Sequence, residues 1–216
     1  LYVVTANYIV NSGRKQLPLP KPLAQTQQPT IGITKSVKDE KKETVKTLVS
    51  DFTPPTGSAQ GPGNLGPWNI RLMTAVSNDG LNWTRTNKIV TDQGDVPDLA
   101  IDKNGRLYLY YTGWTVGNEQ NLTVVAISDD NGQSWVYKKL SLSGFENMAD
   151  PVDPDIQILS DGTFRLYLTS EERQGQKQTP SPETYYAEGK DGISFTKKGV
   201  AFERSGKSIL DPSTVL

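Results

Sequence analysis

Short runs of alternating apolar and polar residues occur along the second half of the chain, and turn residues separate them. RLYLYYT (106–112) follows the turn DKNG, and TVVAIS (123–128) precedes the turn DDNG. A period of two that is closed by an Asn-Gly step is typical of β-hairpins. The pattern therefore predicts an all-β fold made of short antiparallel strands.

These strands recur with a period near 57 residues. DVPDLAIDKNGRLYLYYTGW (95–114) matches VDPDIQILSDGTFRLYLTSEE (152–172), and a third copy begins at LDPSTVL (210–216). The prolines of the three copies are 57 and 58 residues apart. A second series, in which a tight Asp/Gly turn precedes an aromatic residue, has spacings of 52 and 60 residues. Two series at nearly one period indicate tandem units of four strands, which are typical of β-propeller blades.

We therefore predict a single partial β-propeller domain of four-stranded antiparallel blades over residues 1–216. Since a propeller has about four to eight blades, the chain is expected to cover about half of a ring and to be a fragment cut at both ends. Its predicted parts are residues 1–10 with 70–93 (an incomplete first blade), 11–69 (an insertion), 94–146 (a second blade), 147–205 (a third blade) and 206–216 (the first strand of a truncated fourth blade).

The insertion is rich in proline, glutamine and charged residues, and this composition favours a flexible, solvated loop. A short amphipathic helix is the alternative, because the segment contains a capping box and a set of apolar residues at helical spacing. The residues concerned are Ser36 and Asp39 for the box, and Val45, Leu48, Val49 and Phe52 for the apolar face.

The composition limits the chemistry that the chain can carry. It contains no cysteine and no histidine, which excludes disulfides, thiolate nucleophiles, Ser-His dyads and imidazole metal ligands. Catalysis would fall to carboxylates, tyrosines or lysines. No cofactor is predicted, and a metal could only be a hard, oxygen-ligated ion such as calcium in the central channel.

The charge balance also limits the partners. With 23 basic and 24 acidic residues the net charge is −1, which gives no electrostatic argument for nucleic acid. No stretch approaches the roughly 20 apolar residues that span a bilayer. We therefore expect neither a nucleic-acid partner nor a membrane span, and the oligomeric state stays open.

The turns of the second series carry a recognisable motif. SDDNGQSW (128–135) matches the S-x-D-x-G-x-x-W pattern of the Asp-box, and SNDGLNW (77–83) and GKDGISF (189–195) resemble a variant that is one residue shorter. The carboxylate can accept turn N–H groups, the glycine permits a positive φ, and the aromatic residue can pack between blades. We therefore predict structural roles for Asp79, Asp130, Gly132, Trp135 and Asp191.

The alternation of strand direction predicts where a binding site would lie. The start of the first strand of each unit, the end of the second, the start of the third and the end of the fourth share one face, opposite the Asp-boxes. A carboxylate cluster beside aromatic residues on that face is typical of a sugar site. The candidate residues there are Asp95, Asp98, Trp114, Asp153, Asp155, Glu171, Glu172, Arg173 and Asp211.

Some of these residues have a structural alternative. An aspartate that follows a proline, as Asp98 and Asp155 do, often binds nearby backbone N–H groups. Glu171 and Glu172 can equally be a solvated loop pair, and Trp114 can belong to the core. For these positions both interpretations stay open.

Residues 71–216 resemble the five-bladed propeller glycoside hydrolases, which include the arabinanase, β-xylosidase and invertase-like families, and the wider sialidase-like group. VDPDIQILSDGTFRLYLTS is most similar to the third-blade segment of arabinanases, where an aspartate before proline modulates the general acid; Asp153 matches it. The resemblance places the general acid at Asp211, where the family has glutamate, and the catalytic base on a first strand that this chain lacks. It also implies five blades and an extracellular or cell-surface location.

The first functional hypothesis is an enzyme that hydrolyses glycosidic bonds with paired carboxylates. Its catalytic residues would be Asp95, Asp153 and Asp211, and its substrate-binding residues would be Trp114, Asp98, Asp155, Glu171, Glu172 and Arg173. The alternative is a non-catalytic propeller that binds a glycan or a protein on the same face, which the aspartate in place of the family's acidic glutamate favours. Sialidase activity is not expected, because no Arg-Ile-Pro motif or arginine triad is visible.

Overall fold

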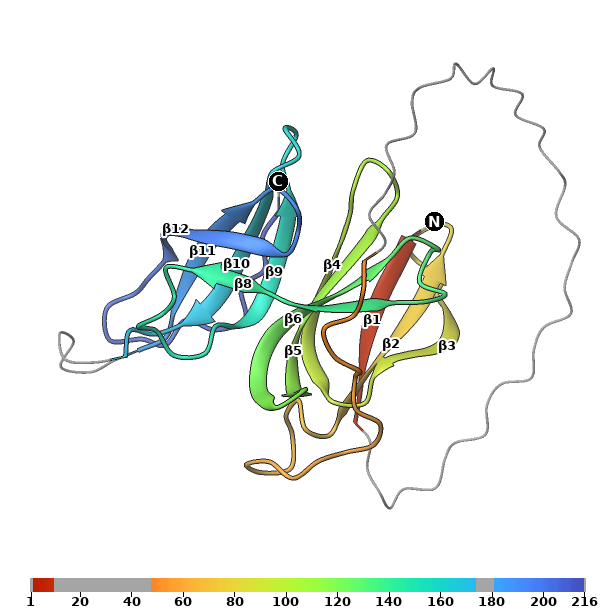
Figure 1. Ribbon diagram of the computed structural model, residues 1–216, viewed down its shortest axis with the longest axis horizontal. Helices are drawn as coiled ribbons and strands as arrows, with labels where there is room; N and C mark the ends of the chain where they lie inside the picture. The colour runs from red at the N-terminus through yellow and green to blue at the C-terminus, as the bar shows by residue number, and fades with distance from the viewer. Residues whose placement is uncertain (1, 10–47, 174–180, 216) are drawn as a thin grey trace, which may run out of the picture. The chain divides into compact units, whose positions relative to one another are not determined.

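The computed structural model describes residues 2–9, 48–173 and 181–215 (Figure 1). These residues form twelve strands and no helix. The strands make three sheets, and all belong to one compact unit. In the described ranges, no helix exists that could cross a membrane.

Each sheet is built from strands that follow one another along the chain. The first sheet has the order β1-β2-β3, with β1 at Tyr2–Ile9, β2 at Ile70–Ser77 and β3 at Thr84–Thr91. The second has the order β4-β5-β6-β7, with β4 at Gly94–Ile101, β5 at Leu107–Val116, β6 at Glu119–Ser128 and β7 at Val136–Lys139. The third has the order β8-β12-β11-β10-β9, with β8 at Ser141–Ser143, β9 at Val152–Ile158, β10 at Phe164–Ser170, β11 at Glu183–Gly189 and β12 at Ser194–Phe202.

The prediction of an all-β propeller-type fold with four-stranded antiparallel blades is confirmed. One strand was not expected. The link between the second and third sheets pairs in parallel with β12, and the Ser141 N–H donates to the Ile193 carbonyl at 3.0 Å. This short strand, β8, covers part of an outer edge whose N–H and C=O groups would otherwise be open.

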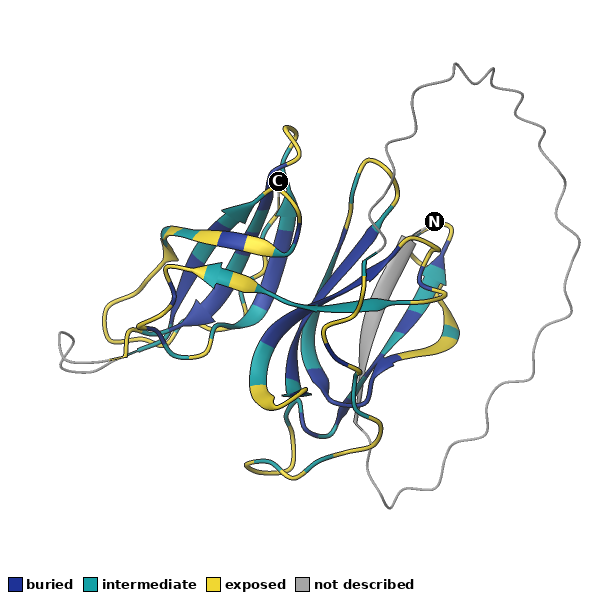
Figure 2. Cartoon of the chain, viewed as in Figure 1, coloured by how far each residue is buried: buried dark blue, intermediate teal, exposed yellow. Residues whose placement is uncertain are grey.

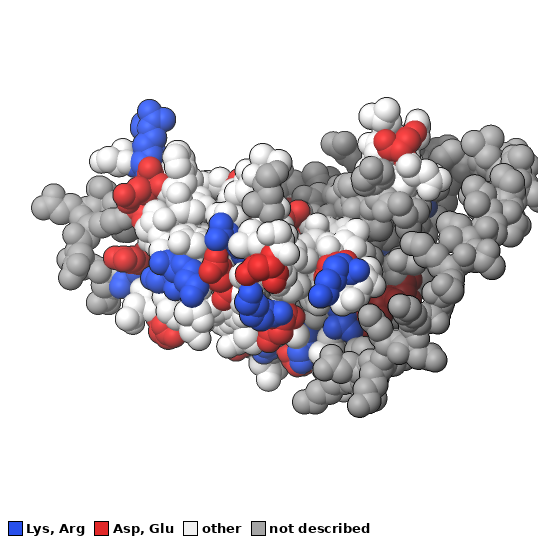
Figure 3. Space-filling view, turned by 90° about the horizontal axis from the view of Figure 1, so that it is seen from above, with Lys and Arg blue, Asp and Glu red and all other residues white. Residues whose placement is uncertain are grey.

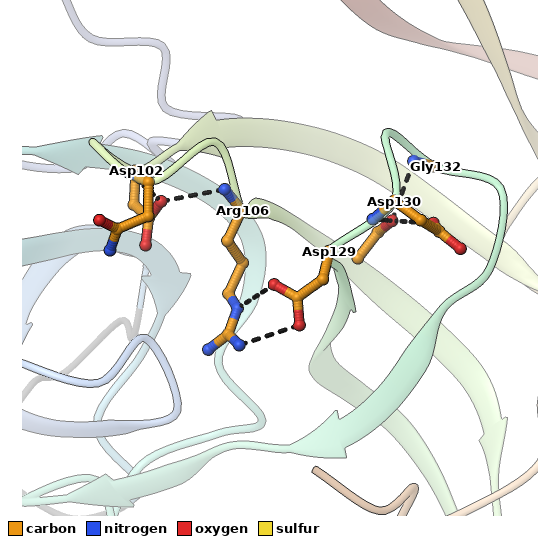
Figure 4. A network of polar contacts seen from close by, with 7 residues as sticks. Asp102, Arg106, Asp129, Asp130 and Gly132 are labelled. Atoms are coloured by element: carbon orange, nitrogen blue, oxygen red, sulfur yellow. Dashed lines mark hydrogen bonds and ion pairs between the residues drawn. The ribbon is translucent and has the colours of Figure 1, made fainter. Parts of the chain in front are cut away.

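The Asn-Gly turn between β6 and β7 shows why these hairpins close. Asn131 and Gly132 have φ angles of 57° and 77°, in the left-handed region that these residue types tolerate best. The Asp130 carboxylate accepts the Ser134 N–H at 2.9 Å and the Ser128 hydroxyl at 2.7 Å. Figure 4 shows Asp130 and Gly132 in this turn. These hydrogen bonds, that of the Ser134 hydroxyl first, lower the pKa of Asp130 to about 2.

The two shorter turns use the same device. Asp79 accepts the N–H groups two and three residues ahead at 2.8 and 2.7 Å, and Asp191 does so at 2.9 and 2.7 Å. The structure therefore places all three aspartates in turns, where their oxygens bind local backbone.

The aromatic residues that follow these turns differ in burial. Phe195 is buried and lies 6.1 Å, centroid to centroid, from Tyr110 of the preceding sheet. Trp135 packs against the core between the first and second sheets. Trp83 is 38% exposed, contrary to the expectation that such residues pack between blades, because no described sheet precedes the first one.

Two repeat-equivalent ion pairs join the second and third strands of a sheet. The Arg106 guanidinium donates to both oxygens of Asp129 at 2.6 and 2.9 Å (Figure 4), and Arg165 binds Glu188 at 2.9 and 2.6 Å. Each acid lies 23 residues after its arginine. Over the face drawn in Figure 3, acidic and basic side chains are interspersed, in keeping with the net charge of −1.

The described part of the insertion, residues 48–69, is ordered onto the sheets. Phe52 is 7% exposed and belongs to the core cluster that the first two sheets share, while the Asp51 N–H donates to the Tyr137 carbonyl at 2.8 Å. Leu48–Phe52 is not helical and Val49 is 73% exposed, so the helix alternative is wrong for these residues. The rest of that predicted helix lies outside the described residues.

The sheets are joined side by side by aromatic packing and by repeated polar contacts. Buried residues concentrate in the middle strands of the second and third sheets (Figure 2). The Asp98 carboxylate of β4 accepts the Ile156 N–H of β9 at 2.7 Å, and the Tyr110 hydroxyl donates to the Gly192 carbonyl at 2.7 Å. One repeat further, the Asp155 carboxylate accepts the Thr214 N–H at 3.2 Å and also binds its hydroxyl.

Asp98→Ala is expected to destabilise the fold by about 1–3 kcal/mol, because it leaves the buried Ile156 N–H without its acceptor. The measurement is the free energy of unfolding by urea. Asp129→Ala is the control, since its ion pair lies at the surface and should contribute less than about 1 kcal/mol. Equal losses in the two variants would contradict a joining role for Asp98.

Candidate functional site

The backbone is distorted at the start of the first strand of each repeat. This strand, which is β4 in one repeat and β9 in the next, is called the inner strand here. Val96, Asp153 and Asp211 each precede a proline and have φ angles of 44°, 54° and 50°. The ladder register shifts at this place in both β4 and β9. A left-handed residue other than glycine is strained, and bulges re-aim side chains, so this feature is typical of functional positions.

The three predicted catalytic aspartates, from three successive repeats, lie within electrostatic reach of one another. Burial, then the carboxylates of Asp211 and Asp95, raise the pKa of Asp153 to about 6. Burial and Asp211 also raise the pKa of Asp95. Asp95 and Asp153 are half-buried, whereas Asp211 is exposed. The structure thus brings these residues together as an acid cluster, defined here as Asp95, Asp153 and Asp211.

Two threonines that sequence reasoning missed support Asp153. The Thr112 hydroxyl accepts the Asp153 N–H at 3.0 Å, and Thr112 pairs with Asp95 in the β4–β5 ladder. Thr169 pairs with Val152, the neighbour of Asp153, in the β9–β10 ladder and opposes the rise in the pKa of Asp153. Both are buried, and they are 57 residues apart. The repeat period itself was the signal that could have found them.

Asp98 and Asp155 line a groove of about 350 Å³ between the inner strands, together with Thr214. Their oxygens accept the inter-sheet hydrogen bonds described above, which favours the structural alternative for both. Burial is also the main cause that raises the pKa of Asp98. A substrate contact by either carboxylate stays a prediction.

The segment of Glu171, Glu172 and Arg173 contacts the link before β9. The Ala149 N–H donates to the Glu171 carbonyl at 2.7 Å, Glu172 forms an isolated bridge with Met148, and Arg173 binds the Asp150 carboxylate at 2.7 Å. Arg173 and Glu172 are exposed. The backbone of Glu171 and Glu172 and the side chain of Arg173 therefore tie this segment to the link.

Trp114 lies at the end of β5, half-buried, with its ring edge-on to Trp68 at a centroid distance of 5.1 Å and an interplanar angle of 69°. Trp68 itself is 8% exposed. The structure therefore pairs Trp114, a predicted substrate-binding residue, with an aromatic ring from the end of the insertion.

Glu183 is a third residue that sequence reasoning missed. It begins β11, on the face opposite the Asp-boxes where the binding site is predicted, and is only 5% exposed. Its carboxylate accepts the Tyr185 hydroxyl at 2.8 Å, and burial is the main cause that raises the pKa of Tyr185. The strand-direction argument covered this position, but a lone glutamate at a strand start carries no motif.

Among residues 48–173 and 181–215, no group of three acidic side chains is arranged to hold a metal ion. The carboxyls of the acid cluster can give or take a proton. Two carboxyls that repel each other share a proton more readily than either would alone.

No protein-family model matches the chain, and no curated protein matches it. Among solved structures, it is similar to a protein of unknown function from Dyadobacter fermentans, with 17% identity and a TM-score of 0.52 over 68% of this chain and 48% of that one. It is also similar to a family 117 glycoside hydrolase from Zobellia galactanivorans, with 16% identity and a TM-score of 0.48 over 69% of this chain and 48% of that one. A third is an ulvan lyase of polysaccharide lyase family 25, with 16% identity, a TM-score of 0.44, and coverage of 73% and 42%.

The chain spans about half the length of the solved structures that it matches. It thus has distant structural similarity, over part of its length, to carbohydrate-active enzymes. Similarity at this identity concerns the fold, and function must be argued from the site. The closer resemblance to arabinanase-like propellers stays a prediction.

Asp153→Asn should make stability less dependent on pH. The folded-state pKa of about 6 exceeds the ordinary 3.8, so the folded state binds the proton more tightly and stability falls as pH rises from about 4 to 6. Asparagine tolerates a positive φ. Above pH 6 the variant should be more stable by about 1–2 kcal/mol, allowing for solvent screening, and the difference should vanish below pH 4.

The measurement is urea unfolding of both proteins at pH 4, 5, 6 and 7. The turn residues Asp79 and Asp130 have lowered pKa values, so below about pH 4 they make stability rise with pH. This opposite slope is the same in both proteins. A difference between the two proteins that is constant across the whole range would contradict the shifted titration.

Proposed function

We propose that this chain belongs to a propeller that hydrolyses glycosidic bonds, with Asp153 as the proton donor. The observation that carries this proposal is the burial of Asp153 beside two further carboxylates, which raises its pKa to about 6. A general acid is most effective when its pKa lies near the working pH, and raised carboxyl pKa values are typical of glycosidase acids.

The other two carboxylates would supply the second half of the reaction. Asp153 transfers its proton to the glycosidic oxygen as the bond to the anomeric carbon breaks, and an ionised neighbour stabilises the positive charge that develops there. Water then adds to that carbon and its proton returns to a carboxylate. Asp211 is exposed and beside Asp153, which suits it to this second role. The resemblance instead put the general acid at Asp211, and burial favours Asp153.

A glycan-binding propeller without catalysis is the second candidate. The Trp68–Trp114 pair favours it, because aromatic rings beside polar groups bind sugars without any need for an acid.

Asp153→Asn should lower kcat/KM by about 100-fold or more on a panel of aryl glycosides and polysaccharides, because asparagine cannot donate the proton. In the wild type, activity should fall as pH rises above about 6, where Asp153 loses its proton. Asp129→Asn, a surface carboxylate on a hairpin, is the matched control and should leave kcat/KM unchanged. If Asp153→Asn turned over substrate as fast as the wild type, the catalytic role of Asp153 would be contradicted. A wild type that is inactive on the whole panel would favour glycan binding without catalysis.

A further inference from the structure

Four buried polar atoms without hydrogen-bond partners belong to Trp68, to Trp114 and to one residue next to each, by sequence or by a backbone hydrogen bond. They are Nε1 of Trp68, Nε1 of Trp114, Oε1 of Gln93 and Oδ1 of Asn69. Trp68 is 8% and Gln93 6% exposed. Nearly all buried polar groups in folded proteins are hydrogen-bonded, and each exception destabilises the fold. Four at one place therefore indicate groups kept for a partner.

The backbone holds these side chains in one neighbourhood. The Trp114 N–H donates to the Gln93 carbonyl at 3.4 Å, and the two indole rings are 5.1 Å apart. Asn69 follows Trp68 directly. The set offers two N–H donors and two carbonyl acceptors beside aromatic rings.

The charged groups nearby are already paired with each other. The Arg71 guanidinium binds the Asp92 carboxylate, which also accepts the Gly57 N–H at 2.7 Å. The Gln93 Nε2 donates to the Gly57 carbonyl at 3.0 Å, whereas the side-chain oxygen of Gln93 has no partner. The groups that lack partners are thus all neutral.

The segment that carries Trp68 closes on itself. The Ala59 N–H donates to the Trp68 carbonyl at 2.7 Å, the Asn69 N–H to the Gly66 carbonyl at 3.1 Å, and the Asn69 Nδ2 to the Asn64 carbonyl at 2.6 Å. A Cβ on Gly61 or Gly66 would come within 2.1 or 2.2 Å of the Trp68 ring, so the loop folds tightly around this ring. A ligand that reaches the buried atoms requires residues 59–69 to move, and these hydrogen bonds, which lie within the segment, do not oppose that movement.

The place of this group relative to the acid cluster follows from the ladder. Gln93 is two residues before Asp95, and Trp114 is two residues after Thr112, the ladder partner of Asp95. Two residues of strand span roughly 6.6 Å. That length is close to the span of one sugar unit, so a chain with one unit here can place its next linkage at the acids.

We propose that Trp68, Trp114, Gln93 and Asn69 form a binding subsite for a neutral sugar ring. The indole N–H groups donate to sugar oxygens, the amide oxygens accept sugar hydroxyls, and the half-buried Trp114 ring packs on the C–H face of the sugar. Among the described residues, the charged side chains next to the subsite, Arg71 and Asp92, are paired with each other, so the subsite selects uncharged units. Its place beside the acids rests on the proposed function, whereas sugar binding itself does not.

The experiment measures binding by calorimetry in the Asp153→Asn protein, in which turnover cannot consume the ligand. The probes are neutral hexasaccharides of glucose, xylose, arabinose and galactose, with hexagalacturonate as the charged probe. At least one neutral probe should bind more tightly than hexagalacturonate, and Trp114→Phe and Gln93→Met should each weaken that binding 10-fold or more. Trp83→Phe, at an exposed tryptophan in an Asp-box turn, is the control and should bind as its parent does.

Gln93→Met removes the unpaired acceptor together with the Nε2 donor to the Gly57 carbonyl. Its melting temperature is therefore measured beside its affinity, and a loss of binding in a protein that melts as the parent does is not unfolding. No binding of any neutral probe, tighter binding of hexagalacturonate, or unchanged affinity in both variants would overturn the subsite. The hydrolysis assay is independent: inactivity with retained neutral-sugar binding overturns the catalytic proposal and leaves the subsite standing.

Discussion

The carboxylate that follows the proline in one repeat accepts a backbone N–H from the next repeat. Asp98 does so with Ile156, and Asp155 with Thr214. Because these bonds run between inner strands, they set how far one inner strand is displaced against the next. Asp153 lies three residues before Ile156 and Asp211 three residues before Thr214, so the positions of both aspartates follow from these contacts. A repeated structural hydrogen bond thus determines where the acid cluster forms.

The acid cluster itself opposes folding. Burying Asp153 beside two like charges raises its pKa, and the molecule tolerates this because the Thr112 hydroxyl holds the Asp153 backbone and the sheets on both sides are well packed. Local destabilisation of this kind is typical of functional positions. The repeat-equivalent residue Val96 keeps the strained φ without the carboxyl, so the backbone distortion belongs to the fold and the charge to particular repeats.

Much of the fold could be read from the sequence because its causes are local. Alternation and Asn-Gly turns predicted the hairpins, and the positions of Asp79, Asp130 and Asp191 within their turns follow from neighbouring N–H groups. The strand β8 could not be read, since a three-residue strand has no pattern and exists because β12 offers it an edge. Trp83 was misjudged because its burial depends on a neighbouring sheet and not on its own turn.

The candidate site divides in the same way. Strand alternation alone put Asp95, Asp153 and Asp211 on one face, since the direction of each strand follows from the hairpin before it. The pKa of Asp153, the engagement of Asp98 and Asp155 with the next strand, and the pairing of Trp68 with Trp114 depend on residues from different repeats. Burial and long-range contact arise only once the sheets pack. The strands, the turns and the face of the predicted site could therefore be predicted from the sequence, because they depend on backbone hydrogen bonds between near neighbours. Packing between sheets decided which carboxylates lie close together and which join one sheet to the next.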